Sequence, residues 1–234
     1  MNKTSCDIAE NVRAILNTMA ETASRCGRDP RTVQLLAVSK TVSPDKIRSA
    51  ASSGIEAFGE NYIQEAMKKI EAIGNCGIRW HFIGRLQTNK AKYAVKFFDL
   101  IHSVDSFKLA YELDRQAGKI NKIQPILIQV NLSSEASKGG VKKSDTLDLV
   151  RRTAELNHLS VKGLMTIPPF FNNPEKARPF FKALRALRDD IRRHAIYGAE
   201  MGVLSMGMSG DYTAAIEEGA TLVRIGTSIF GKRA

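Results

Sequence analysis

The sequence predicts an α/β fold, a single (β/α)₈ TIM barrel over residues 1–234 with one extra helix at the N-terminus. Short apolar runs alternate with amphipathic segments, and neither a linker nor a shift in composition divides them. Strands separated by helices join through right-handed crossovers into a parallel sheet. Eight such units in roughly 200–250 residues are typical of a closed barrel. The alternative is an open doubly wound sheet, but no glycine-rich dinucleotide fingerprint follows the first strand.

The first half of the chain begins with apolar residues at helical spacing over 7–26, which predict an amphipathic helix before the first strand. The run 35–40 has four apolar residues without polar alternation, as in a strand covered on both faces. Ser43 before Pro44 is a helix start, with serine as the N-cap. Further strands are expected at 55–58, 79–83 and 100–104, and helices from after Asn61 to about 73, at 87–98, and at 106–118 with Ser106 as the cap.

The second half continues the alternation. Residues 125–131 form a strongly β-prone fifth strand, and the polar segment 133–140 is a predicted loop. The remaining strands are expected at 161–166, 202–206 and 221–225, and the helices at 144–156, 174–194 and 209–219, before a short turn at 227–230. This gives eight strands in total.

Composition excludes several classes of protein. A hydrophobic content of 43% supports a core, and no apolar run approaches the roughly 18 residues of a membrane span. The polar N-terminus has no signal-peptide core. The three cysteines (Cys6, Cys26 and Cys76) are odd in number and lack metal-type spacing, which favours a reduced, cytoplasmic location and no metal site.

The net charge of +11 raises the question of nucleic acid. Basic residues concentrate at 85–96 and 176–193, and in the second stretch Arg178, Lys182, Arg185 and Arg192 fall close to one helical face. Such a face can attract nucleic acid. Because neither aromatic residues nor a nucleic-acid motif are interleaved, a solvated surface helix is favoured, and the role of the helix 174–194 stays open.

Lys40 ends the first predicted strand. Desolvation lowers the pKa of a lysine, and the neutral amine is a nucleophile that forms a Schiff base with a carbonyl. The alternative is that Lys40 only ends the strand and extends into solvent. The recurrence of polar residues at other strand ends favours a site: these are Asn61, Asn131, Thr166, Ser205 and Arg224. In a barrel, all of them lie at the C-terminal face, where active sites form.

The last two units carry small residues directly before helices, in the segments 205–209 and 224–227. Small residues let backbone amides approach an anion, and the loops after strands seven and eight are the common phosphate site of such barrels. Alternatively, the glycines only make tight turns. A lysine on the first strand and a phosphate site at the last two suit pyridoxal 5′-phosphate (PLP).

Six stretches are more specific than these single positions. They are Ala37-Val38-Ser39-Lys40, Phe58-Gly59-Glu60-Asn61, Trp80-His81-Phe82-Ile83-Gly84 with Gln87, Asn89 and Lys90, Gly163-Leu164-Met165, Ser205-Met206-Gly207-Met208-Ser209, and Val223-Arg224-Ile225-Gly226-Thr227. Through them, from about residue 11 to 231, the chain resembles the YggS/PROSC family of PLP homeostasis proteins. That family is similar to the barrel half of bacterial alanine racemase.

The resemblance implies a cofactor site. Lys40 is implied to carry PLP as a covalent aldimine, Arg224 to face the pyridine nitrogen, and Ser205, Gly226 and Thr227 to hold the phosphate. The matched stretches also place Asn61, Met165, Met206 and Ser209 among the cofactor-binding residues. The implied function is intracellular PLP homeostasis, with PLP-dependent apoenzymes as candidate recipients.

Whether the protein turns over a substrate depends on two features. Arginine only donates hydrogen bonds, so Arg224 would leave the pyridine nitrogen unprotonated and the ring a poorer electron sink. A two-base racemase also needs a second proton-transfer group, which a tyrosine from an added β domain supplies in alanine racemase, whereas this sequence ends just past strand eight. We therefore expect a monomeric, non-catalytic carrier, with a single-domain amino-acid racemase as the alternative.

Overall fold

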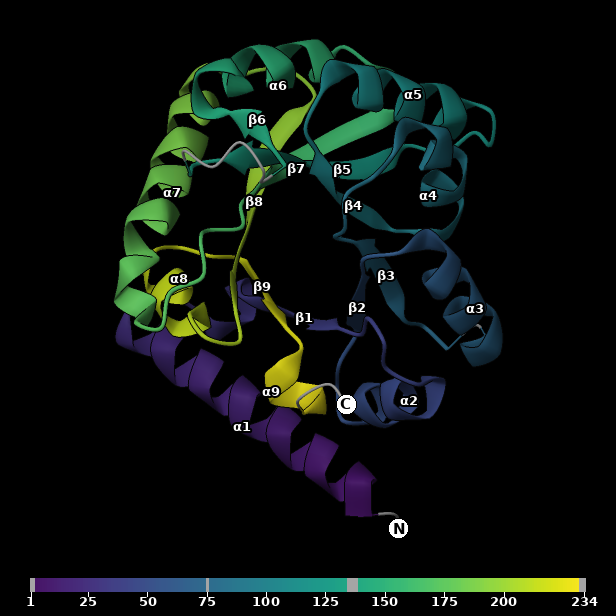
Figure 1. Ribbon diagram of the computed structural model, residues 1–234. Helices are drawn as coiled ribbons and strands as arrows, with labels where there is room; N and C mark the ends of the chain where they lie inside the picture. The colour runs from purple at the N-terminus through teal and green to yellow at the C-terminus, as the bar shows by residue number, and fades with distance from the viewer. Residues whose placement is uncertain (1–2, 75, 134–138, 232–234) are drawn as a thin grey trace.

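The computed structural model describes residues 3–74, 76–133 and 139–231. Eight parallel strands form a closed ring in the order β1-β2-β3-β4-β5-β7-β8-β9, and β9 pairs with β1. Helices surround this ring (Figure 1), which confirms the predicted barrel. The ring strands are β1 Gln34–Val38, β2 Ala57–Glu60, β3 Arg79–Phe82, β4 Leu100–Val104, β5 Gln124–Asn131, β7 Leu159–Met165, β8 Ala199–Met208 and β9 Leu222–Ile225.

The outer layer begins with α1 (Lys3–Arg25), the extra helix, which crosses the outside of the barrel against α2, α8 and α9 (Figure 1). Ser43 is the N-cap residue of α2 and Pro44 its first residue, and the Ser106 side chain caps α5 by accepting from Leu109 N at 3.4 Å. None of the helices within the described ranges is long and apolar enough to cross a membrane. The remaining helices are α2 Pro44–Ser52, α3 Ile63–Ile73, α4 Ala91–Phe97, α5 Phe107–Gly118, α6 Thr146–Ala154, α7 Arg178–Arg193, α8 Tyr212–Glu217 and α9 Thr227–Phe230.

Several elements differ in their bounds from the predictions, and the following differences bear on the site. A two-residue strand, β6 (Val141–Lys142), pairs with the end of β5 just after the predicted loop 133–140, of which 134–138 lie outside the described residues. The first strand ends at Val38, two residues before Lys40. β8 runs to Met208, and the helix expected from Ser209 begins only at Tyr212. Asp211 accounts for the late start, because its Oδ1 accepts from Met208 N at 2.6 Å and closes a turn there.

Alternation along the strands decides which side chains face the barrel interior. Leu36 and Leu222 pack together inside, whereas their neighbours Ala37 and Val223 belong to the large core between strands and helices. On β8, Leu204 and Met206 lie in that outer core, so Ser205 between them faces inward. The interior therefore combines small apolar clusters with a few buried polar groups.

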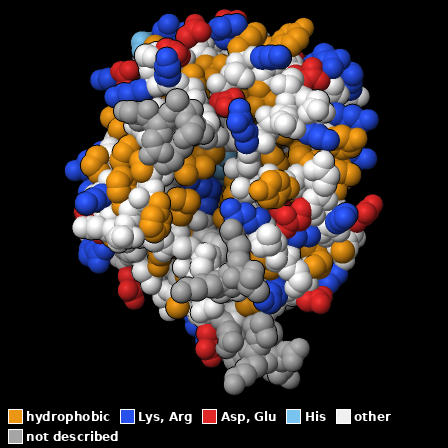
Figure 2. Space-filling view, viewed as in Figure 1, with side chains coloured by type: hydrophobic (Ala, Val, Ile, Leu, Met, Phe, Trp, Pro, Cys, Tyr) orange, Lys and Arg blue, Asp and Glu red, His pale blue; other side chains and the backbone are white. Residues whose placement is uncertain are grey.

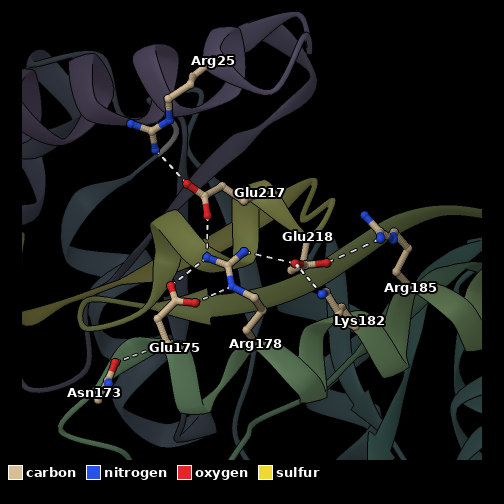
Figure 3. Close-up of polar contacts among 8 residues, drawn as sticks. All are labelled: Arg25, Asn173, Glu175, Arg178, Lys182, Arg185, Glu217 and Glu218. Atoms are coloured by element: carbon tan, nitrogen blue, oxygen red, sulfur yellow. Dashed lines mark hydrogen bonds and ion pairs between the residues drawn. The ribbon is translucent and has the colours of Figure 1, made fainter.

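The basic helix α7 buries one face through Phe181, Leu184, Leu187 and Ile191. Its Arg178 contacts Glu217, the last residue of α8, at 2.6 Å and Glu218, the C-cap residue of that helix, at 3.0 Å. Arg185 approaches Glu218 at 3.4 Å (Figure 3). On the face shown in Figure 2, basic side chains are spread around the rim with acidic ones between them. Much of the cationic face predicted from the sequence is thus matched by carboxylates of the same chain.

Candidate functional site

A cavity of about 300 Å³ opens at the C-terminal ends of the strands. It brings together residues that the sequence placed at separate strand ends. Lys40 follows β1, Asn61 follows β2, and Arg224 lies on β9. Apolar side chains of the segment after β7 complete the wall, and one of them, Phe170, is 85% exposed. Six of the predicted cofactor residues line this cavity: Lys40, Asn61, Ser209, Arg224, Gly226 and Thr227.

The other three predicted residues lie elsewhere. Met206 is fully buried in the outer core, on the opposite side of β8 from Ser205. Met165 packs inside the barrel against Leu100 and Leu127. Ser205 is also fully buried, and its hydroxyl contacts protein groups below the cavity. A single strand cannot present consecutive residues to the same face, which is why Ser205 and Met206 separate.

The side chain of Arg224 is held by a chain of hydrogen bonds among buried polar groups. Its Nη1 donates to Ser205 Oγ at 2.7 Å, and its Nη2 donates to Thr166 O at 2.9 Å. Ser205 Oγ lies 3.0 Å from His102 Nδ1, and His102 Nε2 lies 3.1 Å from His81 Nδ1. Ser205 Oγ accepts from Arg224, and its own proton can be donated to His102 Nδ1; in that arrangement a neutral His102 carries its proton on Nε2 and donates it to His81.

Burial sets the charges in this chain. It lowers the pKa of His81 to about 4 and holds the pKa of the fully buried His102 well below its usual value, so both rings are neutral at pH 7. Burial also lowers the pKa of Arg224 to about 10, which leaves the guanidinium charged. The histidines were missed as site residues by the sequence reasoning, although alternation on β3 and β4 is a signal that turns both rings inward.

We expect the unfolding free energy to fall as the pH drops from 6.5 toward 4. In this window an unfolded His81 is protonated while the folded one, with a pKa of about 4, is not, so the unfolded state binds more protons and stability is lost on acidification. The difference between this pKa of about 4 and the ordinary histidine value of 6.5 corresponds to on the order of 3 kcal/mol. Denaturant titrations at pH 7 and pH 4.5 measure it. The variant His81→Gln should lose less stability over this range, and an equal loss would contradict the assignment.

The turn between β8 and α8 contributes to the wall of the cavity. Burial raises the pKa of Asp211, although the carboxylate accepts from Met208 N and lies in the field of Arg224. This turn holds Ser209 and Gly210 at the cavity, and Gly226 and Thr227 at the start of α9 line the same cavity. Gly226 lies close to β1, because a Cβ there would meet Val38 O at 3.2 Å. Because β8 and β9 are neighbouring strands, the two segments follow adjacent strand ends, and both contribute residues to the cavity wall.

The residues present fit PLP. Asn61 Oδ1 is buried without a hydrogen-bond partner among the described residues, so the cavity wall has an acceptor to offer a ligand. Gly84 lets the backbone of Asn61 come near, since a Cβ at Gly84 would stand 2.1 Å from Asn61 O. Around this group lie an amine (Lys40), a guanidinium (Arg224) and two hydroxyls (Ser209 and Thr227). These donors match an aldehyde, a ring nitrogen and a phosphate.

Comparisons with known proteins agree with this geometry. The family model described as alanine racemase, N-terminal domain, matches residues 8–234. A pyridoxal phosphate homeostasis protein of Aquifex aeolicus (strain VF5) is 47% identical over 224 residues, 96% of this chain and 97% of the relative. The crystal structure of an unknown protein from Bifidobacterium adolescentis has a TM-score of 0.93 at 33% identity, covering 98% of this chain and 97% of the other.

A further solved structure contains the cofactor. PipY of Synechococcus elongatus PCC7942, with PLP bound, has a TM-score of 0.82 at 37% identity and covers 91% of this chain and 100% of its own. The family model and the full-length relatives give the same assignment as the six matched stretches. The chain belongs to the alanine racemase N-terminal-domain family, among the pyridoxal phosphate homeostasis proteins.

Proposed function

We propose that this protein binds PLP through a covalent linkage to Lys40 and serves intracellular PLP homeostasis by holding the cofactor without turnover. The observation that carries the proposal is the meeting of Lys40, Arg224 and the hydroxyls of Ser209 and Thr227 at one cavity of about 300 Å³. The homeostasis relatives at 39–47% identity and the PLP-bound PipY support it. PLP-dependent apoenzymes are the proposed recipients.

Each residue has a distinct part. PLP supplies an aldehyde, which the neutral amine of Lys40 captures as a Schiff base with loss of water. Arg224 donates toward the pyridine nitrogen and, as a cation held by Ser205 and Thr166, disfavours protonation there. Ser209, Thr227 and the backbone at Gly226 hold the phosphate. Ser205 acts on the cofactor only through Arg224, because its hydroxyl contacts Arg224 and His102 within the protein.

A racemase is the competing function, and it requires a second proton-transfer group facing the cofactor. Among the described residues that line the cavity, the titratable side chains are Lys40, Asp211 and Arg224. Asp211 accepts from Met208 N at 2.6 Å and so belongs to its own turn. The described wall therefore offers no tyrosine, cysteine or histidine as the second base.

We expect the PLP-loaded protein to incorporate little solvent deuterium at the α-carbon of alanine or serine. An unprotonated pyridine is a poor electron sink, and the described cavity wall lacks a tyrosine, cysteine or histidine as second base. Mass spectrometry of amino acids incubated in deuterium oxide, with optical purity followed in parallel, measures this. Exchange at typical enzyme rates, on the order of 1–10³ per second, would contradict the carrier function and support the racemase instead.

A further inference from the structure

A mostly buried ion cluster contacts the backbone of Ser39 and Thr41, the residues on either side of Lys40. Its centre is Lys69 of α3, whose Nζ donates to Ser39 O at 2.6 Å, Glu60 Oε1 at 2.8 Å and Glu65 Oε1 at 2.5 Å. An ammonium has three donors, so these contacts use all of them. The side chain of Lys69 is only 8% exposed, and that of Glu60 is completely buried.

The contacts of this ion cluster hold the peptide groups on both sides of Lys40. The peptide carbonyl before it, Ser39 O, accepts from Lys69. The peptide amide after it, Thr41 N, donates to Glu65 Oε1 at 2.5 Å. Ser39 is fixed a second time, because its Oγ donates to Glu60 Oε1 at 2.6 Å. One cluster therefore holds the backbone on both sides of the residue that enters the cavity.

The backbone held in this way is strained. Thr41 has a φ of 64°, in the left-handed region that β-branched residues avoid. Such a conformation costs free energy and persists only where surrounding contacts impose it. Buried ion pairs in general stabilise a fold no more than apolar residues of the same volume, and often less. Their placement against this strained turn points to a local role in shaping the 39–41 segment.

We propose that Lys69, together with Glu60 and Glu65, is a positioning group that sets the peptide turn at 39–41 and so directs the amine of Lys40 into the cavity. The inference rests on the proposed function, since it assigns Lys69 a purpose only if Lys40 is the residue that captures PLP. It makes Lys69 a determinant of how fast and how tightly Lys40 reacts, while Lys69 itself touches no cofactor.

The test replaces Lys69 by methionine, which fills a similar volume without charge. Two quantities are measured: hydrogen exchange of the Thr41 amide in the unloaded protein, and the rate at which the absorbance band of covalently bound PLP forms at fixed pH. Loss of contacts made by charged groups should speed the exchange about tenfold to a hundredfold. The band should form at least about tenfold more slowly.

Arg178→Met is the matched control. Arg178 is likewise the centre of an ion cluster, contacting Glu175, Glu217 and Glu218 on the outside of the barrel (Figure 3). This variant should lower the unfolding midpoint and leave both the Thr41 exchange and the band formation at wild-type rates. A slowing of the band by Arg178→Met equal to that by Lys69→Met would show a general effect of stability and overturn the proposal.

A second pair of variants tests the cluster where Lys69→Met fails to fold. Glu65→Gln keeps a side-chain carbonyl that can accept from Thr41 N, whereas Glu65→Ala removes it. We expect glutamine to restore most of the loading rate that alanine loses. Equal, wild-type loading in Glu65→Gln and Glu65→Ala overturns the inference while leaving PLP binding intact. If wild-type protein forms no adduct at Lys40, the proposed function fails instead, and the exchange of Thr41 in unloaded protein still decides whether the cluster holds the turn.

Discussion

Replacing Lys40 with alanine is expected to abolish the absorbance band of covalently bound PLP while the protein stays folded. Lys40 is half-buried and follows the end of β1, outside the apolar core, so its truncation leaves the barrel packing intact. The proposed covalent linkage to PLP needs an amine at position 40, so we expect the absorbance band to be lost completely in Lys40→Ala. Borohydride reduction of the wild type, followed by peptide mass mapping, should place one PLP adduct on Lys40.

Lys46 provides the matched control for this experiment. It shares a second cavity of about 300 Å³ with Lys40 and so lies among the lysines near the same face. Lys46→Ala should retain the band. A band that survives in Lys40→Ala, or an adduct that maps to another lysine, would remove Lys40 from its assigned role.

Removal of the phosphate from the ligand is expected to weaken binding by at least about 10³-fold. Ser209, Thr227 and Gly226 line the cavity, and we assign the phosphate to the two hydroxyls and to the backbone around Gly226. Hydrogen bonds to a charged group contribute about 1.5–3 kcal/mol each, so three of them account for this factor. Fluorescence or absorbance titrations with PLP and with pyridoxal measure the two affinities, and equal affinities would contradict the assignment.

Two serine variants separate the roles that the structure gives to Ser209 and Ser205. Ser209→Ala should weaken PLP but leave pyridoxal binding unchanged, because Ser209 lies at the proposed phosphate end of the cavity. Ser205→Ala should weaken both ligands alike, because Ser205 Oγ holds Arg224, the residue that we propose faces the ring. If Ser205→Ala affected PLP alone, Ser205 would be a phosphate ligand after all, as the sequence resemblance implies.

The sequence by itself determined the barrel and placed several residues of the candidate site at one face. Parallel strands all end at one face, so Lys40, Asn61 and Arg224 could be placed near one another from their positions after or on apolar runs. The predicted strands all exist, because each is a short segment with buried apolar residues that suits a sheet covered on both faces. These features depend on the order of apolar and polar residues along the chain, which a single sequence contains.

The tertiary structure alone decided which side chains of those strands meet inside the barrel and which pack in the outer core. Ser205 turned inward to Arg224 and His102, and Met206 turned outward into the core, because closure of the ring fixes the face that each strand shows. The contact of Lys69 with Ser39 joins residues 30 positions apart. Sequence periodicity reports the spacing of residues within one element, whereas such contacts depend on how a helix docks on the neighbouring strand, and only the folded chain specifies that.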